Sequence, residues 1–191
     1  MMNRRQAISR VGLLLGGTIV GMNLFLQGCK TEEKDNYKEL SFSDDDVRYL
    51  DEIAETILPE TNTPGAKAAG VGAFMTVMVK DCYTANDQKV FKEGLEKLKN
   101  DFQKKQSKSF LEASSDERHN FLVDLDNEQK EYMKNKKGDE PAHYFRMMKE
   151  LTLLGYFTSE VGATQALRYV ETPGRYEGCI PYKKGDRAWA I

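Results

Sequence analysis

Few side chains in this sequence have the type and spacing needed for catalysis. The 191 residues include only two histidines and three cysteines. His143 comes three residues after Glu140, a spacing that could set an imidazole beside a carboxylate as an acid–base pair. Because His143 also opens an apolar run, a contact at a helix N-terminus is the favoured interpretation. His119 follows Arg118 at the polar start of another expected helix and is predicted to be solvated.

Motifs for the common catalytic and cofactor sites do not occur in the sequence. It contains no glycine-rich nucleotide loop, no serine-nucleophile motif and no covalent haem motif. The acidic pair Asp124 and Asp126 lacks a partner that would mark a glycosidase. Met75 and Met78 have helical spacing, which fits core packing better than metal ligation. We therefore expect no catalytic residue, metal site or cofactor in this chain.

Composition places the chain among folded proteins of ordinary charge. Hydrophobic residues make up 40% and charged residues 30%, which is typical of a globular domain. The formal net charge of -2 argues against a protein that binds nucleic acid electrostatically. The length suits one domain with a tail.

Residues 1–28 have the pattern of an export signal. They contain Arg4, Arg5 and Arg10 and no acidic residue, followed by a glycine-interrupted apolar stretch over residues 11–26. Sixteen residues reach about 24 Å as a helix, short of a ~30 Å hydrocarbon core. Residues 3–8, which include Arg4 and Arg5, resemble the twin-arginine export motif. The alternative is a general secretory signal that has two arginines by chance.

The end of this signal resembles a bacterial lipobox. Leu26-Gln27-Gly28-Cys29 would place a lipid on the Cys29 thiol before cleavage, whereas the alternative is an ordinary signal with an incidental cysteine. Residues 29–42 then form a polar tether. Loss of residues 1–28 leaves 25 basic and 30 acidic residues, a net charge of -5. We expect an exported chain, held by lipid on a membrane and facing the periplasm or the cell surface.

The expected route carries proteins that are already folded. A domain of this size without a cofactor motif has little intrinsic need for that route. The mismatch suggests that a protein bound to this chain is what must cross in the folded state.

The body of the sequence, residues 43–191, predicts an all-α fold. Apolar residues recur at three-to-four spacing, and turn signals such as Pro59 and Pro64-Gly65 separate the periodic segments. Ser43 and Ser114 are expected caps, the latter in a capping box with Glu117. Helices are expected over residues 43–57, 68–83, 86–108, 114–136 with a break near 127, and 142–158, with a turn or short helix in 159–169. The helix over 142–158 is strongly apolar, and we expect it, with Leu154 and Phe157, to be central to the core. We expect a single irregular helical domain with a loop-rich C-terminal tail.

Cys82 and Cys179 are the thiols that remain if Cys29 is lipidated. An oxidising compartment allows a disulfide between them, which would close a loop of roughly 100 residues and contribute about 4–5 kcal/mol in the chain-entropy model. Two separate buried thiols are an equally good interpretation, because Cys82 lies in an apolar run.

The C-terminal tail concentrates side chains that often dominate protein interfaces. Arginine, tyrosine and tryptophan cluster there between glycines and prolines, as in a docking surface. The alternative is that they pack over their own helices. The residues are Arg168, Tyr169, Arg175, Tyr176, Tyr182, Arg187 and Trp189.

Three segments together resemble one known family. The helix end, turn and next helix over residues 57–71 read "P-acid-x-x-x-PGA-x-x-AGV", and the segments 151–169 and 173–181 follow in the same order. They are similar to the gluconate 2-dehydrogenase subunit 3 family over about residues 45–182. Members of that family are the small subunits of membrane-associated flavin dehydrogenases for sugars and alcohols.

The resemblance implies a non-catalytic accessory subunit. It implies a large subunit of the glucose-methanol-choline oxidoreductase type that holds FAD and oxidises the substrate. Electrons would pass to a cytochrome c or to quinone. The small subunit would supply the export signal for the folded flavin subunit, and this chain, as a lipoprotein, would also hold the complex at the membrane.

Two other functional interpretations remain open on the sequence alone. One is a free-standing envelope lipoprotein that binds a ligand or has a structural role. The other is an enzyme in its own right, which would need a buried polar cluster around His143 or His119.

Overall fold

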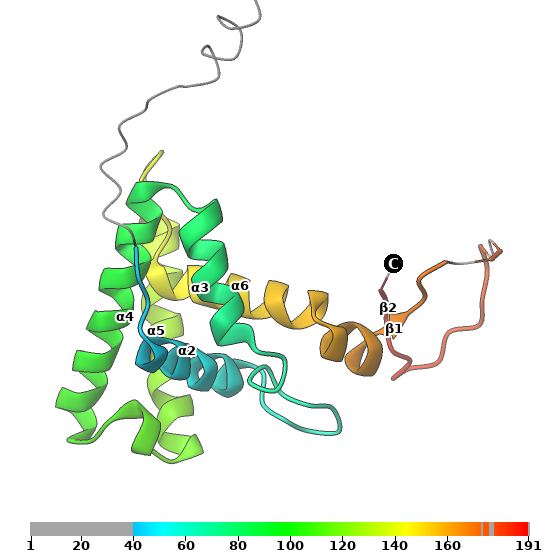
Figure 1. The fold of residues 1–191 in the computed structure, drawn as a ribbon, viewed down its shortest axis with the longest axis horizontal. Helices are drawn as coiled ribbons and strands as arrows, with labels where there is room; N and C mark the ends of the chain where they lie inside the picture. Colours follow the sequence, from blue (N-terminus) through cyan, green and yellow to red (C-terminus); the bar gives the residue numbers. More distant parts are fainter. Residues whose placement is uncertain (1–39, 173, 176–177, 191) are drawn as a thin grey trace, which may run out of the picture. The chain divides into compact units, whose positions relative to one another are not determined.

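The structure, a computed structural model, describes residues 40–172, 174–175 and 178–190. Its helices pack around one core and confirm the predicted all-α fold (Figure 1). The main helices are α2 (Asp44–Ile57), α3 (Val71–Cys82), α4 (Ala85–Gln106), α5 (Ser115–Asn135) and α6 (Tyr144–Thr158). Short elements are the 3-10 turn η1 (Phe110–Glu112), the π-helical turn η2 (Gly162–Ala166), and strands β1 (Arg168–Tyr169) and β2 (Trp189–Ala190).

Polar side chains at the helix starts accept hydrogen bonds from the free backbone N–H groups, and the predicted caps Ser43 and Ser114 are confirmed. Ser43 begins α2 and exchanges hydrogen bonds with Asp46 in a capping box. Ser114 and Glu117 form the expected capping box of α5. Thr84 caps α4 by accepting from the Asp87 N–H.

Two helices differ from their predictions by more than one or two residues at an end. Helix α3 begins at Val71 rather than at residue 68, because Gly70 has a left-handed backbone (φ +67°) that ends the preceding turn. Helix α5 runs through residue 127 without the expected break. Its apolar side chains Phe121, Leu122 and Leu125 and the buried Gln129 keep one face against the core, so packing continues across that point.

The predicted tail contains a strand pair that the sequence analysis does not anticipate. Strands β1 and β2 are parallel, with Arg168 opposite Trp189 and Tyr169 opposite Ala190. Each strand is two residues long, too short to show a period-two pattern in the sequence.

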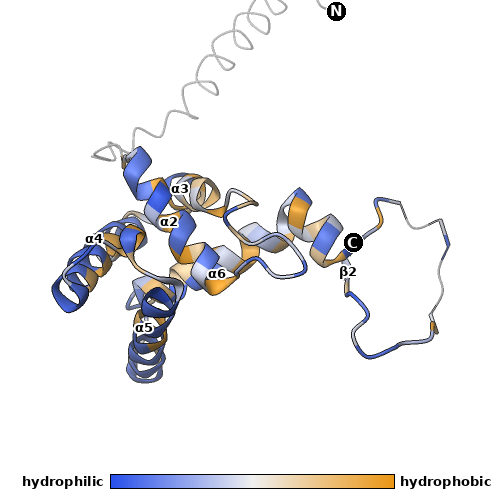
Figure 2. Cartoon of the chain, turned by 90° about the horizontal axis from the view of Figure 1, so that it is seen from below, coloured by the Kyte–Doolittle hydropathy of each residue, from blue (hydrophilic) through white to orange (hydrophobic). Residues whose placement is uncertain are grey.

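Helix α6 is central to the core, as its apolar sequence predicts. Its buried face includes Phe145, Met148 and Leu151, and it packs on α2, α3, α4 and α5. Side chains from the other helices complete the cluster, among them Leu50, Ile53, Met75, Phe91, Leu95, Leu98, Phe102, Phe121 and Leu122. The outer faces of α4 and α5 are hydrophilic by contrast (Figure 2).

The packed domain begins slightly earlier than predicted. Leu40 and Phe42, which we assign to the polar tether from sequence, are half-buried against the core. The Phe42 ring meets Phe91 edge-on at a centroid distance of 6.1 Å, and the Lys92 ammonium lies 5.0 Å from it. The predicted signal, residues 1–28, and most of the tether lie outside the described residues. Within the described part of the chain, no helix is long and apolar enough to cross a membrane.

Candidate functional site

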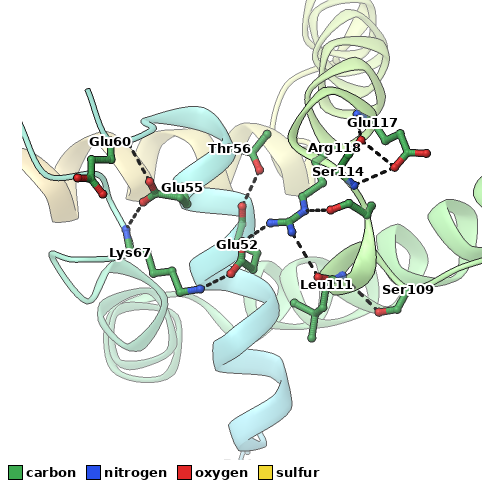
Figure 3. Close-up of polar contacts among 11 residues, drawn as sticks. Glu52, Glu55, Thr56, Glu60, Lys67, Ser109, Leu111, Ser114, Glu117 and Arg118 are labelled. Atoms are coloured by element: carbon green, nitrogen blue, oxygen red, sulfur yellow. Dashed lines mark hydrogen bonds and ion pairs between the residues drawn. The ribbon is translucent and has the colours of Figure 1, made fainter. Parts of the chain in front are cut away.

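The turn between α2 and α3 is held by one carboxylate of α2. Glu55 accepts a hydrogen bond from the Glu60 N–H (2.8 Å) with one oxygen and from the Lys67 N–H (2.9 Å) with the other (Figure 3). A Cβ atom on Gly65 would overlap this carboxylate. The glycine of the Pro-Gly-Ala pattern therefore leaves the space in which Glu55 clamps the turn.

Helix α6 holds the same turn from its other side. The Tyr156 hydroxyl donates to the Pro64 carbonyl at 2.7 Å, and the Thr63 hydroxyl lies 3.4 Å away. Residues 59–62 of the turn remain exposed. Two of the three segments that carry the family resemblance, residues 57–71 and 151–169, are thus in direct contact in the folded chain.

A second carboxylate of α2 joins three parts of the fold. Glu52 binds the Lys67 ammonium with one oxygen and the Arg118 guanidinium with the other (Figure 3). Arg118 also donates to the carbonyls of Ala113 and Leu111, at 3.1 and 3.3 Å. Burial alone would raise the pKa of Glu52, but the two cations outweigh burial and lower the pKa. Glu52 is therefore a structural anion between α2, the turn and the start of α5.

Asp51 fixes the closest approach of α2 and α3. Its Oδ1 accepts from the Gly72 N–H at 2.8 Å. Burial raises the pKa of Asp51, and this hydrogen bond only partly offsets the effect. A Cβ on Gly72 would lie 2.5 Å from that oxygen and 2.7 Å from the Val47 carbonyl oxygen, so only glycine fits here.

Asp46 is a buried charge that the sequence analysis does not find. Although it belongs to an acidic first turn, its side chain is buried and accepts from Lys92 at 2.6 Å and Lys99 at 2.5 Å. Burial would raise its pKa, but the two lysines and the Ser43 N–H hold it well below its usual range. The Ser-x-x-Asp spacing of a capping box is the signal that could have marked it.

The structure corrects the possible pairing of His143 with Glu140. Glu140 accepts from the Lys137 N–H, whereas His143 Nδ1 caps α6 by accepting from the Phe145 N–H at 3.2 Å. The second ring nitrogen, Nε2, lies 3.8 Å from Glu128 Oε1. The favoured prediction, a contact at a helix N-terminus, is confirmed.

The surroundings of His143 favour its neutral form. The ring lies between Tyr132 and Tyr144, with centroids 5.5 and 4.4 Å away. Burial lowers the pKa of His143, Glu128 opposes that shift, and Lys97 adds to it. Burial also raises the pKa of Tyr144 to about 12. Both aromatic groups are thus neutral at physiological pH, and His143 uses one nitrogen to cap a helix.

The remaining candidates from the sequence lie at the surface or outside the described residues. His119 is exposed, as predicted. Among the described residues, no group of three or more His, Cys, Asp or Glu side chains is arranged to hold a metal ion. Cys82 and Cys179 are free and exposed, so the structure does not show the disulfide and corrects the alternative of two buried thiols. Arg4, Arg5 and Cys29 lie in the part that is not described.

The tail residues fall into two groups. Arg168, Arg187 and Trp189 come together: the Arg168 guanidinium lies 4.3 Å from the Trp189 ring, and its Nε donates to the Arg187 carbonyl at 2.8 Å. Arg187 in turn donates to the carbonyls of Thr164 and Gln165 at the end of η2, at 3.2 and 2.8 Å. These arginines hold the tail together as well as presenting charge.

The second group consists of exposed side chains. Tyr169, Arg175 and Tyr182 are exposed, and Tyr182 reaches 76% of its full accessible surface. Tyr176 lies outside the described residues.

Helix α6 carries an exposed apolar group where the sequence analysis expects core. Leu153, Leu154 and Phe157 are 44%, 46% and 39% exposed, so Leu154 and Phe157 do not belong to the core as predicted. The apolar run 151–157 is longer than one buried face requires. That excess is the sequence signal for a surface in addition to a core.

Comparison with known proteins adds one match. The family model described as gluconate 2-dehydrogenase subunit 3 matches residues 44–174. The match covers α2 to β1 and ends before most of the tail. Neither the curated proteins nor the solved structures contain a match.

Proposed function

The chain belongs to the gluconate 2-dehydrogenase subunit 3 family, and from this premise we propose that it is the non-catalytic small subunit of an extracytoplasmic, FAD-dependent sugar or polyol dehydrogenase. The family match, which spans the helical domain, is the observation that carries this proposal. As a subunit of a dehydrogenase, the chain acts beside a catalytic partner. In the proposal that partner is a large flavin subunit of the glucose-methanol-choline type, which passes electrons to a cytochrome c or to quinone.

The use of the buried and half-buried polar groups supports a non-catalytic role. His143 uses Nδ1 to accept the hydrogen bond that caps α6. Glu52, Glu55 and Asp51 each hold a neighbouring segment of the fold. Because these groups are engaged in holding the backbone, the helical domain serves as a rigid body for binding another protein.

The sequence of the first 29 residues supports export and tethering. Arg4 and Arg5 would direct the chain to the twin-arginine route, and the folded flavin subunit would cross with it. Cys29 would carry the lipid that keeps the complex on the membrane. In this proposal the small subunit has three tasks: to escort, stabilise and anchor the flavin subunit.

Export of the partner tests the proposal directly. We expect the double variant Arg4→Lys, Arg5→Lys, in the full chain expressed with its dehydrogenase, to lower the amount of exported flavin dehydrogenase about tenfold or more. The reason is that the paired arginines would be the signal that the export machinery recognises. Quantitative blotting of both subunits and FAD fluorescence in each cell fraction measure this. Arg10→Lys, outside the pair, is the matched control and should leave export unchanged.

The lipid anchor is tested separately. Cys29→Ala should leave export intact but move both subunits from the membrane fraction to the soluble extracytoplasmic fraction. A dehydrogenase that reaches its destination independently of Arg4 and Arg5, or a wild-type chain that purifies without a flavoprotein, would contradict the proposal. The second result would favour a free-standing lipoprotein.

A further inference from the structure

One face of α6 changes character halfway along the helix. At about 100° per residue, Arg146, Glu150, Leu153, Leu154 and Phe157 lie within one stripe. The first two are exposed and form an ion pair at 2.5 Å. The last three are the exposed apolar side chains, which we call the α6 patch. The exposed face of α6 therefore carries charged side chains in its N-terminal half and apolar side chains in its C-terminal half.

Charge is also depleted around the α6 patch. Residues 151–167 contain one charged residue, Glu160, in a chain that is 30% charged overall. The hydropathy colouring shows the contrast between the C-terminal half of α6 and the hydrophilic outer faces of α4 and α5 (Figure 2). Depletion of charge at an exposed apolar group is the composition of the centre of a protein interface.

The family match indicates what covers this surface. A function shared by the family must be located within residues 44–174, and the α6 patch lies inside that range. Tyr182, Arg187 and Trp189, for which the sequence leaves docking and packing over their own helices equally open, lie beyond it. What the family shares is association with a dehydrogenase.

The surroundings of the patch favour a protein over a lipid surface. Helices that lie on a membrane carry lysine and arginine on their polar face, whereas residues 150–167 contain neither. The neighbouring rim is the clamped turn, because Tyr156, beside Phe157 at a ring distance of 5.2 Å, binds the Pro64 carbonyl. Three half-exposed side chains supply only part of the ~800 Å² per partner that a stable complex buries. A large partner that also covers the turn fits this need better than a second copy meeting the patch alone.

We propose that the α6 patch, with the exposed turn at residues 59–62 as its rim, is the surface on which the catalytic dehydrogenase subunit docks. This inference rests on the proposed function. The surface of the partner that meets it is apolar and weakly charged, because the patch offers no charge to pair. The tail beyond residue 174 lies outside the centre of the contact.

Capture of the flavin subunit by patch variants tests this assignment. Leu154→Glu and Phe157→Glu, each in the full tagged chain expressed with its dehydrogenase, should lower the flavoprotein captured per chain at least tenfold. Val123→Glu is the matched control, because Val123 is 43% exposed on α5 and should retain capture. Tyr182→Ala should also retain capture. Circular dichroism of each variant establishes that the helices are folded.

The outcomes separate this inference from the proposed function. If the wild-type chain captures no flavoprotein, the proposed function fails. If the wild type captures it and the folded patch variants do so equally, the docking surface is wrong.

Two other occupants of the patch would also overturn the inference. The first is a second copy of this chain, which would be indicated if the wild type is a homodimer and Leu154→Glu makes it a monomer without changing capture of the flavoprotein. The second is a lipid surface. It would be indicated if Cys29→Ala protein binds phosphatidylethanolamine–phosphatidylglycerol vesicles and Leu154→Glu abolishes this binding without changing capture of the flavoprotein.

Discussion

At the scale of single residues, the groups that look chemically active in the sequence hold the fold together. His143 is the clearest case, because its buried ring uses Nδ1 as a hydrogen-bond acceptor for the Phe145 N–H. An imidazolium has no acceptor, so protonation would remove this cap and place a charge between two tyrosine rings. The same histidine that suggests an acid–base pair in sequence is a neutral helix cap in the structure.

This use of His143 makes stability depend on pH in a defined direction. Since the pKa of His143 is lowered in the fold, the unfolded chain binds more protons between the folded pKa and the ordinary value of 6.5. The contribution of neutral His143 to the free energy of unfolding is therefore complete above about pH 6.5. It is lost as the pH falls through 6.5 toward the folded pKa. We expect His143→Asn, which keeps an acceptor at the cap, to lose less stability than wild type between about pH 7 and pH 5.

Urea unfolding followed by circular dichroism at each pH measures the difference. His119→Asn is the control, because His119 is exposed and should leave the wild-type pH dependence in place. If the free energy of unfolding depended on pH equally in wild type and His143→Asn, then His143 would bind no additional proton when the chain unfolds.

Burial of a single charge is the feature that sequence reveals least well. Asp44, Asp45 and Asp46 are adjacent acids at a helix start, and the helix dipole accounts for all three equally. Only Asp46 is buried, because lysines from α4, forty-six and fifty-three residues away, reach it. A contact between distant helices leaves no local pattern, whereas the Ser43 cap, set by spacing within one turn, is predictable.

At the scale of elements, α2 organises the turn that carries the family pattern. The acid of that pattern, Glu60, contributes its backbone N–H, and the clamping carboxylate is Glu55, one helical turn before Pro59. Two glycines here have a steric reason: Gly65 of the pattern leaves space for the Glu55 carboxylate, and Gly72, directly after the pattern, allows α2 to approach α3. The pattern thus encodes a fixed crossing of α2 and α3, with the exposed residues 59–62 held in place.

The crossing of α2 and α3 should therefore be intolerant of a single methyl group. In Gly72→Ala the new Cβ would meet both Asp51 Oδ1 and the Val47 carbonyl, so the helices must separate and the partly buried hydrogen bond of Asp51 is strained. We expect a loss of about 2–3 kcal/mol in the free energy of unfolding, which denaturant melts would measure.

Gly174→Ala is the matched control for this substitution. A Cβ at Gly174 meets no atom within 4 Å, so its stability should stay within ~0.5 kcal/mol of wild type. Equal stability for the two variants would mean that the helices do not approach as closely as the structure has them.

Element ends are predictable where a local side chain sets them. The starts of α2 and α5 follow from Ser43 and Ser114, and the end of α6 at Thr158 matches its apolar period. The start of α3 is not predictable in this way. Apolar residues precede Gly70, and only the left-handed φ at that glycine prevents the helix from beginning earlier. The exposure of Leu153, Leu154 and Phe157 on α6 is missed for a related reason: apolar periodicity does not distinguish a core from an interface.

At the scale of the whole molecule, the described chain has a helical core held by buried apolar side chains and a tail held by a few exposed contacts. The core is a continuous cluster of buried side chains from α2 to α6. The tail is tied by a two-residue strand pair, by the Arg168–Trp189 contact and by the hydrogen bonds of Arg187. The family match ends at residue 174, so most of the tail lies outside the matched range.

The single tryptophan of the chain, Trp189, lies in that tail and can report on it separately. Local opening that breaks only a few exposed contacts costs much less free energy than unfolding a buried core. We therefore expect the urea midpoint of Trp189 fluorescence to fall about 1 M or more below that of far-ultraviolet circular dichroism, which follows the helices. Trp189→Ala should leave the circular dichroism transition within ~0.5 kcal/mol of wild type. Coincident transitions would instead mean that the tail unfolds with the core, and then the tail would have to be treated as part of the rigid body that presents the α6 patch.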